Sequence, residues 1–195
     1  TRLRTVTGVQ TCALPIFVGL GTVQALERVK PTVSGPSRSQ VREEEALREA
    51  AGRPTGAVVA VDAEPALAAA IATALGQGGS RPEVVVGETP SDRAVAANEA
   101  RAVAYVAVAP GDDLKRAVVF HWGTPTTHSP AGKLLAGGVA EELAAEGVTG
   151  VVVEPLAVAT LRETRMPAIV VDVPRATAAA MAAAVARGVA RFLGA

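Results

Sequence analysis

A chain of 195 residues with 49% hydrophobic and 19% charged side chains has the length and composition of one globular domain with a sizeable core. Its formal net charge is zero, from 19 basic and 19 acidic side chains. This balance argues against nucleic acid as the main partner, because phosphate binding needs a clustered positive field. Aromatic residues make up only 3% of the chain, so we expect a core of small aliphatic side chains and closely packed helices.

The first 55 residues are expected to lie outside the folded domain. Residues 6–16, VTGVQTCALPI, resemble the conceptual translation of a sequencing-library adapter, so residues 1–16 are treated as an artefact. They include Cys12, the only cysteine; without it the chain has no disulfide and no Cys-ligated metal. Residues 17–55 are interpreted as a linker or the remnant of an export segment. For the apolar stretch 17–25, the end of a secretory signal and a chance sequence both stay open.

Regular alternation of strands and helices begins at Gly56. Apolar and β-branched runs predict strands at 57–61, 83–86, 103–108, 115–120, 151–153 and 168–171. Start and stop residues predict helices at 64–75, 91–101, 129–146 and 176–193, with Ser91 and Ser129 at the N-terminal ends of two of them. No apolar run of 18 or more residues occurs in this region, so we predict no membrane span in the body of the chain.

Strands separated by helices predict an α/β domain over residues 56–195. We expect three layers: a largely parallel sheet of about six strands, with helices on both faces. The link at 109–115 is too short for a crossover. The two strands that it joins are therefore predicted to form one antiparallel hairpin.

Asp172 is the first candidate site residue. It follows the apolar run Ala168–Val171, at the end of a predicted parallel strand. Ligands bind at the carboxyl ends of strands in open α/β sheets, so an acid at this position is a candidate for chemistry. A second interpretation stays open: an Asp just before Val173 and Pro174 can simply turn the chain.

Three blocks of sequence, in the same order, resemble zinc-dependent N-acetylmuramoyl-L-alanine amidases. Residues 161–172, LRETRMPAIVVD, resemble the family's LR-x-T-x-x-PA segment before the strand that carries its catalytic Glu. Residues 90–102, PSDRAVAANEARA, resemble its R-x-x-x-AN helix, and residues 129–136, SPAGKLLA, resemble its S-x-x-LA helix start. The resemblance covers about residues 64–193 and implies the α/β fold of a cell-wall amidase domain.

The resemblance also implies a zinc ion held by two His and one Glu, with a further Glu as general base. Glu64 matches the position of the metal-binding Glu, but Ala109 stands where the family has a zinc-binding His. No G-H-G-G loop follows the first strand, and no His precedes His121. Asp172 matches the catalytic Glu with a side chain one methylene shorter. These departures imply a degenerate metal site, and we expect no zinc cofactor.

His121 and His128 are the only imidazoles, and they flank a Thr/Pro/Gly loop. One interpretation is that they converge on a metal, although a spacing of seven residues matches no tight ligand motif. In the other, His128 packs near the start of its helix, while His121 and Trp122 end a half-buried strand. Trp122 is a candidate for contact with a peptide or a sugar, because an indole offers an apolar face and one donor.

Other enzyme classes have no support, because G-x-S-x-G, P-loop and strand-linked G-x-G-x-x-G motifs are all absent from the sequence. We therefore predict a bacterial amidase-like pseudoenzyme that binds peptidoglycan or its stem peptides, or acts as a scaffold, in the periplasm or elsewhere outside the cytoplasm. The alternative is an active amidase that cleaves the bond between N-acetylmuramic acid and L-alanine. That activity would require zinc, recruited for example by His121, His128 and an acid.

Overall fold

The computed structural model describes residues 55–112 and 114–194. The segments up to residue 54, which we interpreted as adapter-like sequence and linker, lie outside the described residues. The strands are β1 (Val58–Ala63), β2 (Arg81–Val84), β3 (Ala104–Gly111), β4 (Val118–Trp122), β5 (Val152–Leu156) and β6 (Ala168–Pro174). The helices are α4 (Pro65–Gln77), α5 (Pro90–Glu99), α6 (Pro130–Ala145), α7 (Ala159–Glu163), the 3-10 turn η2 (Arg175–Thr177) and α8 (Ala178–Leu193).

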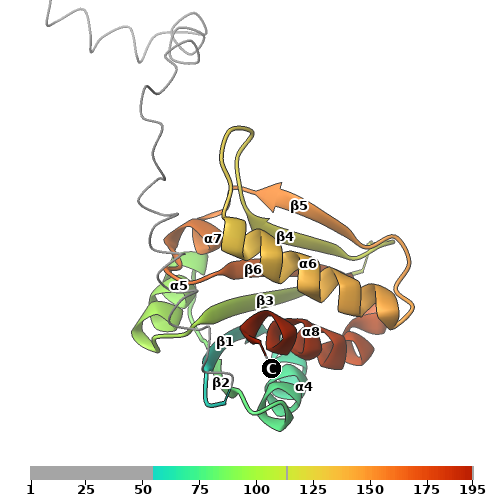
Figure 1. The fold of residues 1–195 in the computed structure, drawn as a ribbon, viewed down its shortest axis with the longest axis horizontal. Helices are drawn as coiled ribbons and strands as arrows, with labels where there is room; N and C mark the ends of the chain where they lie inside the picture. Colours follow the sequence, from blue (N-terminus) through green and yellow to red (C-terminus); the bar gives the residue numbers. More distant parts are fainter. Residues whose placement is uncertain (1–54, 113, 195) are drawn as a thin grey trace, which may run out of the picture. The chain divides into compact units, whose positions relative to one another are not determined.

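The six strands form one sheet in the order β2-β1-β3-β6-β4-β5 (Figure 1). β2, β1, β3 and β6 run parallel to one another, whereas β4 pairs antiparallel with β6 and parallel with β5. This arrangement confirms the predicted largely parallel sheet of about six strands.

The predicted hairpin between the third and fourth strands is wrong, because β6 lies between β3 and β4. Ile169 of β6 pairs with Val106 on one side and with His121 on the other. Ile169 and Val171 are fully buried, and such an apolar strand is stabilised most in the middle of a sheet, where both of its faces are covered. The expected antiparallel pair does occur, but β4 makes it with β6.

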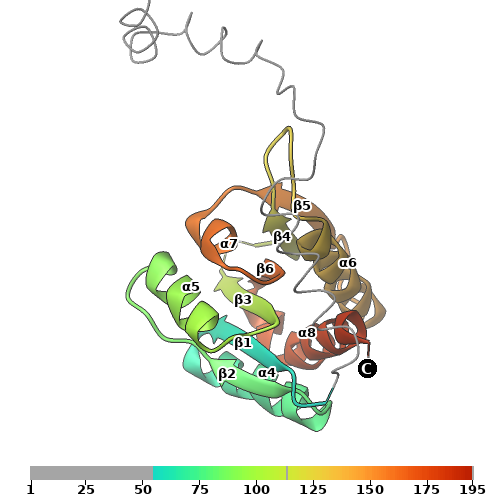
Figure 2. The same ribbon diagram turned by 60° about the vertical axis from the view of Figure 1, so that its left-hand side comes forward.

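Helices cover both faces of the sheet (Figure 2). α4, α6 and α8 pack on one face, and α5 and α7 pack on the other. Alternate residues of each strand face opposite layers, so Ile169 and Val171 contact the first set of helices and Val170 faces the second. Ile169 and Val171 are buried, while Val170 is half-buried.

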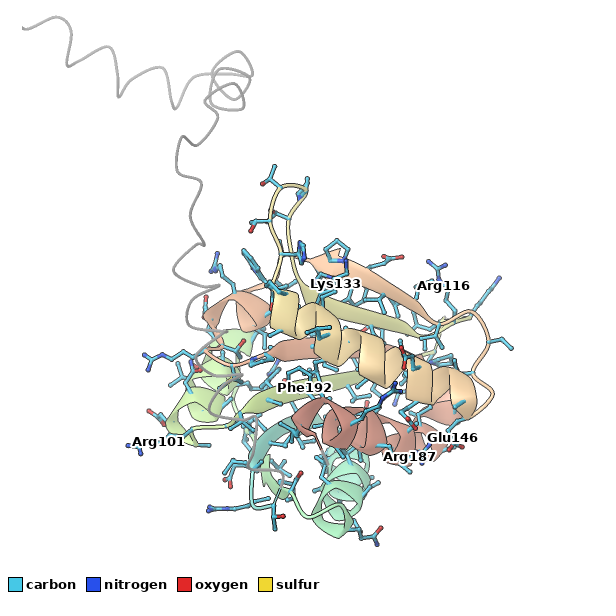
Figure 3. The ribbon with its side chains drawn as sticks, in the orientation of Figure 1. Arg101, Arg116, Lys133, Glu146, Arg187 and Phe192 are labelled. Carbon is cyan, nitrogen blue, oxygen red and sulfur yellow. The ribbon has the colours of Figure 1, made fainter. Side chains whose placement is uncertain are left out.

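The contact between α6 and α8 depends on small residues. A Cβ atom at Gly188 would lie 2.5 Å from the Cα atom of Val139, so only glycine allows this approach of the two backbones. Beside this contact, Arg187 of α8 bonds to Glu142 and Glu146 of α6 (Figure 3). The alanine-rich, aromatic-poor composition therefore serves close helix packing, as expected from the sequence.

The segment Arg175–Leu193 is the one helix in the described part of the chain that is long and apolar enough to cross a membrane. Half of its most apolar window is buried inside the domain. Its buried residues, which include Met181, Val185 and Val189, belong to the core cluster shared with α4 and α6. We therefore assign α8 as a core helix.

Some element ends differ from the prediction. The N-cap of α5 lies two residues earlier than expected, at Thr89 rather than Ser91. The Thr89 side chain accepts from the Asp92 amide, and the Asp92 carboxylate accepts from the Thr89 amide. β2 begins at Arg81, where the Arg81 amide bonds to the Ala57 carbonyl. Pairing, rather than the apolar run, sets this strand's limits. The Ser129 cap is confirmed by its 2.8 Å bond from the Gly132 amide.

Candidate functional site

The carboxyl ends of β1, β3 and β6 meet at one edge of the sheet, where Asp62, Ala109 and Asp172 lie. Ala109 and Asp172 are register partners on adjacent parallel strands. All three side chains lie on the face covered by α5 and α7, because every second residue of a strand shares a face. Ala109 lies two residues after Ala107, Asp62 two after Ala60 and Asp172 two after Val170, and these three preceding residues belong to or pack against the core cluster of that face. The three residues therefore border the region where open α/β sheets bind ligands.

Asp62 is the polar anchor of this edge. Its Oδ2 atom accepts a hydrogen bond of 2.6 Å from the Tyr105 hydroxyl and one of 2.8 Å from Arg93 Nε. Arg93 Nη1 also donates to the Gly87 carbonyl, at 3.0 Å. Burial raises the pKa of Tyr105, and its bond to Asp62 raises it further, so this phenol stays protonated and donates. These bonds fix α5, which carries Arg93, against the end of β1.

A cleft of about 520 Å³ lies between α5, α7 and the sheet, next to this anchor. Its floor includes Ala107, Ala109 and Val170, and Asp62 with Arg93 forms its polar end. The opposite wall carries Leu156 and Val158. Trp122 is half-buried against the same apolar cluster and pairs in register with Leu156. The cleft is therefore mostly apolar, with one ion pair at its end and an indole beside its far wall.

Glu64, which the sequence resemblance matches to a metal-binding Glu, is hydrogen-bonded to a side chain of this protein. Arg175 Nη1 lies 3.0 Å from each of the two Glu64 carboxylate oxygens. The same guanidinium donates from Nε to Asp112 at 2.8 Å and from Nη2 to the Pro110 carbonyl at 3.1 Å. The bond to Glu64 is the largest cause of a raised pKa for Arg175. A permanent cation thus already neutralises this carboxylate.

The other residues at this edge do not complete a zinc site. Ala109 offers no donor atom, and Asp172 makes no side-chain hydrogen bond within the described part of the chain. Burial raises the pKa of Asp172, which opposes the ionised form that a metal requires. Within residues 55–112 and 114–194, no three His, Cys, Asp or Glu side chains are grouped so that they could hold a metal ion. The residues present do not fit the zinc ion that the sequence resemblance implies.

The two histidines lie on the other side of the sheet. His121 alternates with Phe120 and Trp122 on β4, so it faces α6, whereas Trp122 faces the cleft side. The ring centres of His121 and His128 are 5.9 Å apart. The sheet therefore separates the two histidines from Asp172. Asp172 cannot be the acid of a zinc site that includes them.

Sequence reasoning gave no role to Asp62, Arg93 or Arg175. Asp62 follows the apolar run 57–61 in the sequence just as Asp172 follows the run 168–171, so the same rule could have selected it. Arg93 and Arg175 carried no such signal, because their partners lie 31 and 111 residues away in the chain.

Comparison with solved structures gives the same fold for several amidases. The N-acetylmuramoyl-L-alanine amidase AmiC2 of Nostoc punctiforme matches with a TM-score of 0.59 at 18% identity, over 72% of this chain and 99% of that one. The apo form of Ami1 from Mycobacterium abscessus matches with a TM-score of 0.58 at 15% identity, over 71% and 99%. An N-acetylmuramoyl-L-alanine amidase from Clostridium difficile 630 matches with a TM-score of 0.55 at 17% identity, over 71% and 95%.

At these identities the likeness establishes the fold alone. No protein-family model matches the sequence, and no curated protein matches it. The described domain thus has the amidase fold and spans nearly the whole length of these solved structures.

Proposed function

We propose that this domain is a non-hydrolytic, amidase-like module that binds peptidoglycan or its stem peptides, or holds them as a scaffold. The observation that carries this proposal is the bond between Arg175 and Glu64. A metal ion at Glu64 would have to displace a guanidinium that makes four hydrogen bonds in the described structure. It would then find no histidine at position 109. We therefore propose that the domain holds no catalytic zinc.

The cleft supports ligand binding without hydrolysis. Asp62 Oδ1 and Arg93 Nη2 make no hydrogen bond among the described residues, so one acceptor and one donor stay available beside an apolar floor. A peptide group offers the matching N–H donor and C=O acceptor, and small alkyl side chains such as those of alanine suit the floor of Ala107 and Ala109. The solved structures of this fold are named N-acetylmuramoyl-L-alanine amidases, and we infer the class of ligand from that name. Because peptidoglycan lies outside the cytoplasm, we propose an extracytoplasmic location.

Sedimentation with purified peptidoglycan tests this proposal. Ala109 is exposed on the cleft floor, so Ala109→Leu places a larger side chain in the cleft. Trp122→Ala removes the indole beside the cleft wall. We expect each change to lower the bound fraction roughly fivefold or more, as truncating or blocking a central contact does. Leu134→Ala is the matched control, because Leu134 is an exposed apolar residue on α6, on the other face of the sheet.

Two outcomes would contradict the proposal. If the wild-type protein does not sediment with peptidoglycan, binding is excluded. If Leu134→Ala reduces sedimentation as strongly as Ala109→Leu, the binding is surface adhesion rather than recognition in the cleft.

A further inference from the structure

The side chains of His121 and His128 have the spacing of two ligands of one metal ion. Their ring centres are 5.9 Å apart, and the ring planes meet at 67°. Two imidazoles whose nitrogens stand about 2.0–2.1 Å from a shared ion have ring centres roughly 5–6.5 Å apart, depending on the angle at the metal. The observed separation lies inside this range without any movement of the backbone.

His121 is already held in the tautomer that a metal ligand needs. Its Nδ1 atom lies 3.0 Å from the Trp122 carbonyl oxygen, which can only accept, so Nδ1 carries the proton and Nε2 carries the lone pair. Metal-binding histidines characteristically use the second nitrogen in this way, as a donor to a backbone carbonyl. The bond therefore fixes both the protonation and the orientation of the ring.

The Nε2 atom of His121 lacks a partner. His121 is only 4% exposed, and no described side chain or backbone group bonds to this nitrogen. A buried polar atom without a protein partner is unusual, and this nitrogen is free to accept a ligand.

His128 supplies the accessible half of the pair. It is exposed, it precedes the N-cap Ser129 of α6, and a bridge to Gly123 holds its backbone beside the end of β4. Neither of its ring nitrogens makes a hydrogen bond within the described residues. The ring can therefore turn to admit an ion toward His121 and then coordinate it.

We propose that His121 and His128 form a two-histidine site for a divalent transition-metal ion such as Ni²⁺, Cu²⁺ or Zn²⁺, with water in the remaining positions. The site faces α6 and is separated by the sheet from the cleft and from Asp172. Lys133, in the first turn of α6 (Figure 3), adds positive charge near His121, and among the described residues no third His, Cys, Asp or Glu joins the pair as a ligand. Binding is therefore weaker than at a three-ligand site, and removing Lys133 strengthens it.

Titration of the full-length, untagged protein with NiCl₂ by calorimetry tests this inference, in a Cys12→Ser background that removes the one thiol. We expect one saturable site, an affinity at least about tenfold lower in His128→Ala, and a higher affinity in Lys133→Ala. His128 is exposed, so His128→Ala should keep the wild-type circular dichroism and melting temperature in the absence of metal. NiCl₂ should raise the melting temperature of the wild-type protein and not that of His128→Ala, because an ion that binds only the folded state stabilises it.

The inference is overturned if the wild-type protein shows no saturable Ni²⁺ binding, or if His128→Ala binds Ni²⁺ as tightly as the wild type. Glu64→Gln is the control at the amidase-like edge and should leave Ni²⁺ binding unchanged. Loss of Ni²⁺ binding in Glu64→Gln would show that the metal binds near Glu64 and would also overturn the inference.

Discussion

Arg175 Nη1 lies 3.0 Å from both carboxylate oxygens of Glu64, and this contact joins the loop before α4 to the turn after β6. The same guanidinium reaches Asp112 and the Pro110 carbonyl at the end of β3. Two carboxylates and a carbonyl are an oxygen set that suits a metal ion, but here they surround a side chain of the protein. Arg175 thus offsets the negative charge of Glu64 and Asp112 and connects the segments that carry them.

Arg175→Gln should lower the melting temperature, and the loss should be larger at low salt. The variant keeps hydrogen-bonding groups but leaves Glu64 and Asp112 without their cation, and salt screens such exposed interactions. Calorimetry at two NaCl concentrations measures both effects. Arg116→Gln removes a single exposed pair with Glu154 and is the control, for which a smaller change is expected. Equal losses in the two variants would contradict a connecting role for Arg175.

Gly188→Ala should destabilise the domain by about 1–3 kcal/mol, because the new methyl group would overlap Val139 at the α6–α8 contact. Gly137→Ala is the matched control on α6. A Cβ at Gly137 has no atom within 4 Å, so alanine there should stabilise the helix by about 0.5–1 kcal/mol. Urea unfolding of both variants provides the comparison. A neutral Gly188→Ala would show that the two helices pack less closely than described.

Thr89→Ala should cost about 0.5–2 kcal/mol, since it removes the side chain that caps α5. Ser91→Ala should change the free energy of unfolding by no more than about 0.5 kcal/mol, although Ser91 was the cap expected from the sequence. Chemical denaturation of the two variants distinguishes the two assignments. A larger loss for Ser91→Ala would favour the sequence-based one.

Asp172→Asn should be more stable than the wild type at pH 7. Burial raises the folded-state pKa of Asp172 above its ordinary value of 3.8, so the folded state binds more protons than the unfolded state as the pH rises past 3.8. Stability therefore falls across that window, and the ionised carboxylate destabilises the folded state at neutral pH. Asn does not ionise and removes this cost. Melting curves should show an advantage for Asp172→Asn at pH 7 that shrinks as the pH approaches 3.8; an advantage independent of pH would contradict this explanation.

The alternation of strands and helices could be predicted from local sequence, because apolar runs and Pro or Gly signals act over a few residues. The place of β6 could not, since its insertion between β3 and β4 depends on which strand gains most from burial on both faces. The short helix α7 was missed for a related reason: five residues carry too little periodicity to be recognised.

The candidate site was predicted only in part. Asp172 was found by its place after a strand, and it does lie at the expected edge. The contact between Arg175 and Glu64 could not be found, because the two residues are 111 positions apart and each looks like an ordinary surface charge in the sequence. The separation of His121 from Asp172 likewise follows from strand order and alternation, which the sequence alone left open.

Muropeptide analysis tests directly the proposal that this domain does not hydrolyse its ligand. Purified peptidoglycan is incubated with the wild-type protein and added Zn²⁺, and the soluble products are separated by chromatography and mass spectrometry. We expect no release of stem peptides that begin with L-alanine. Release of such peptides by the wild-type protein, abolished in Asp172→Ala, would contradict it and restore the function of an active amidase.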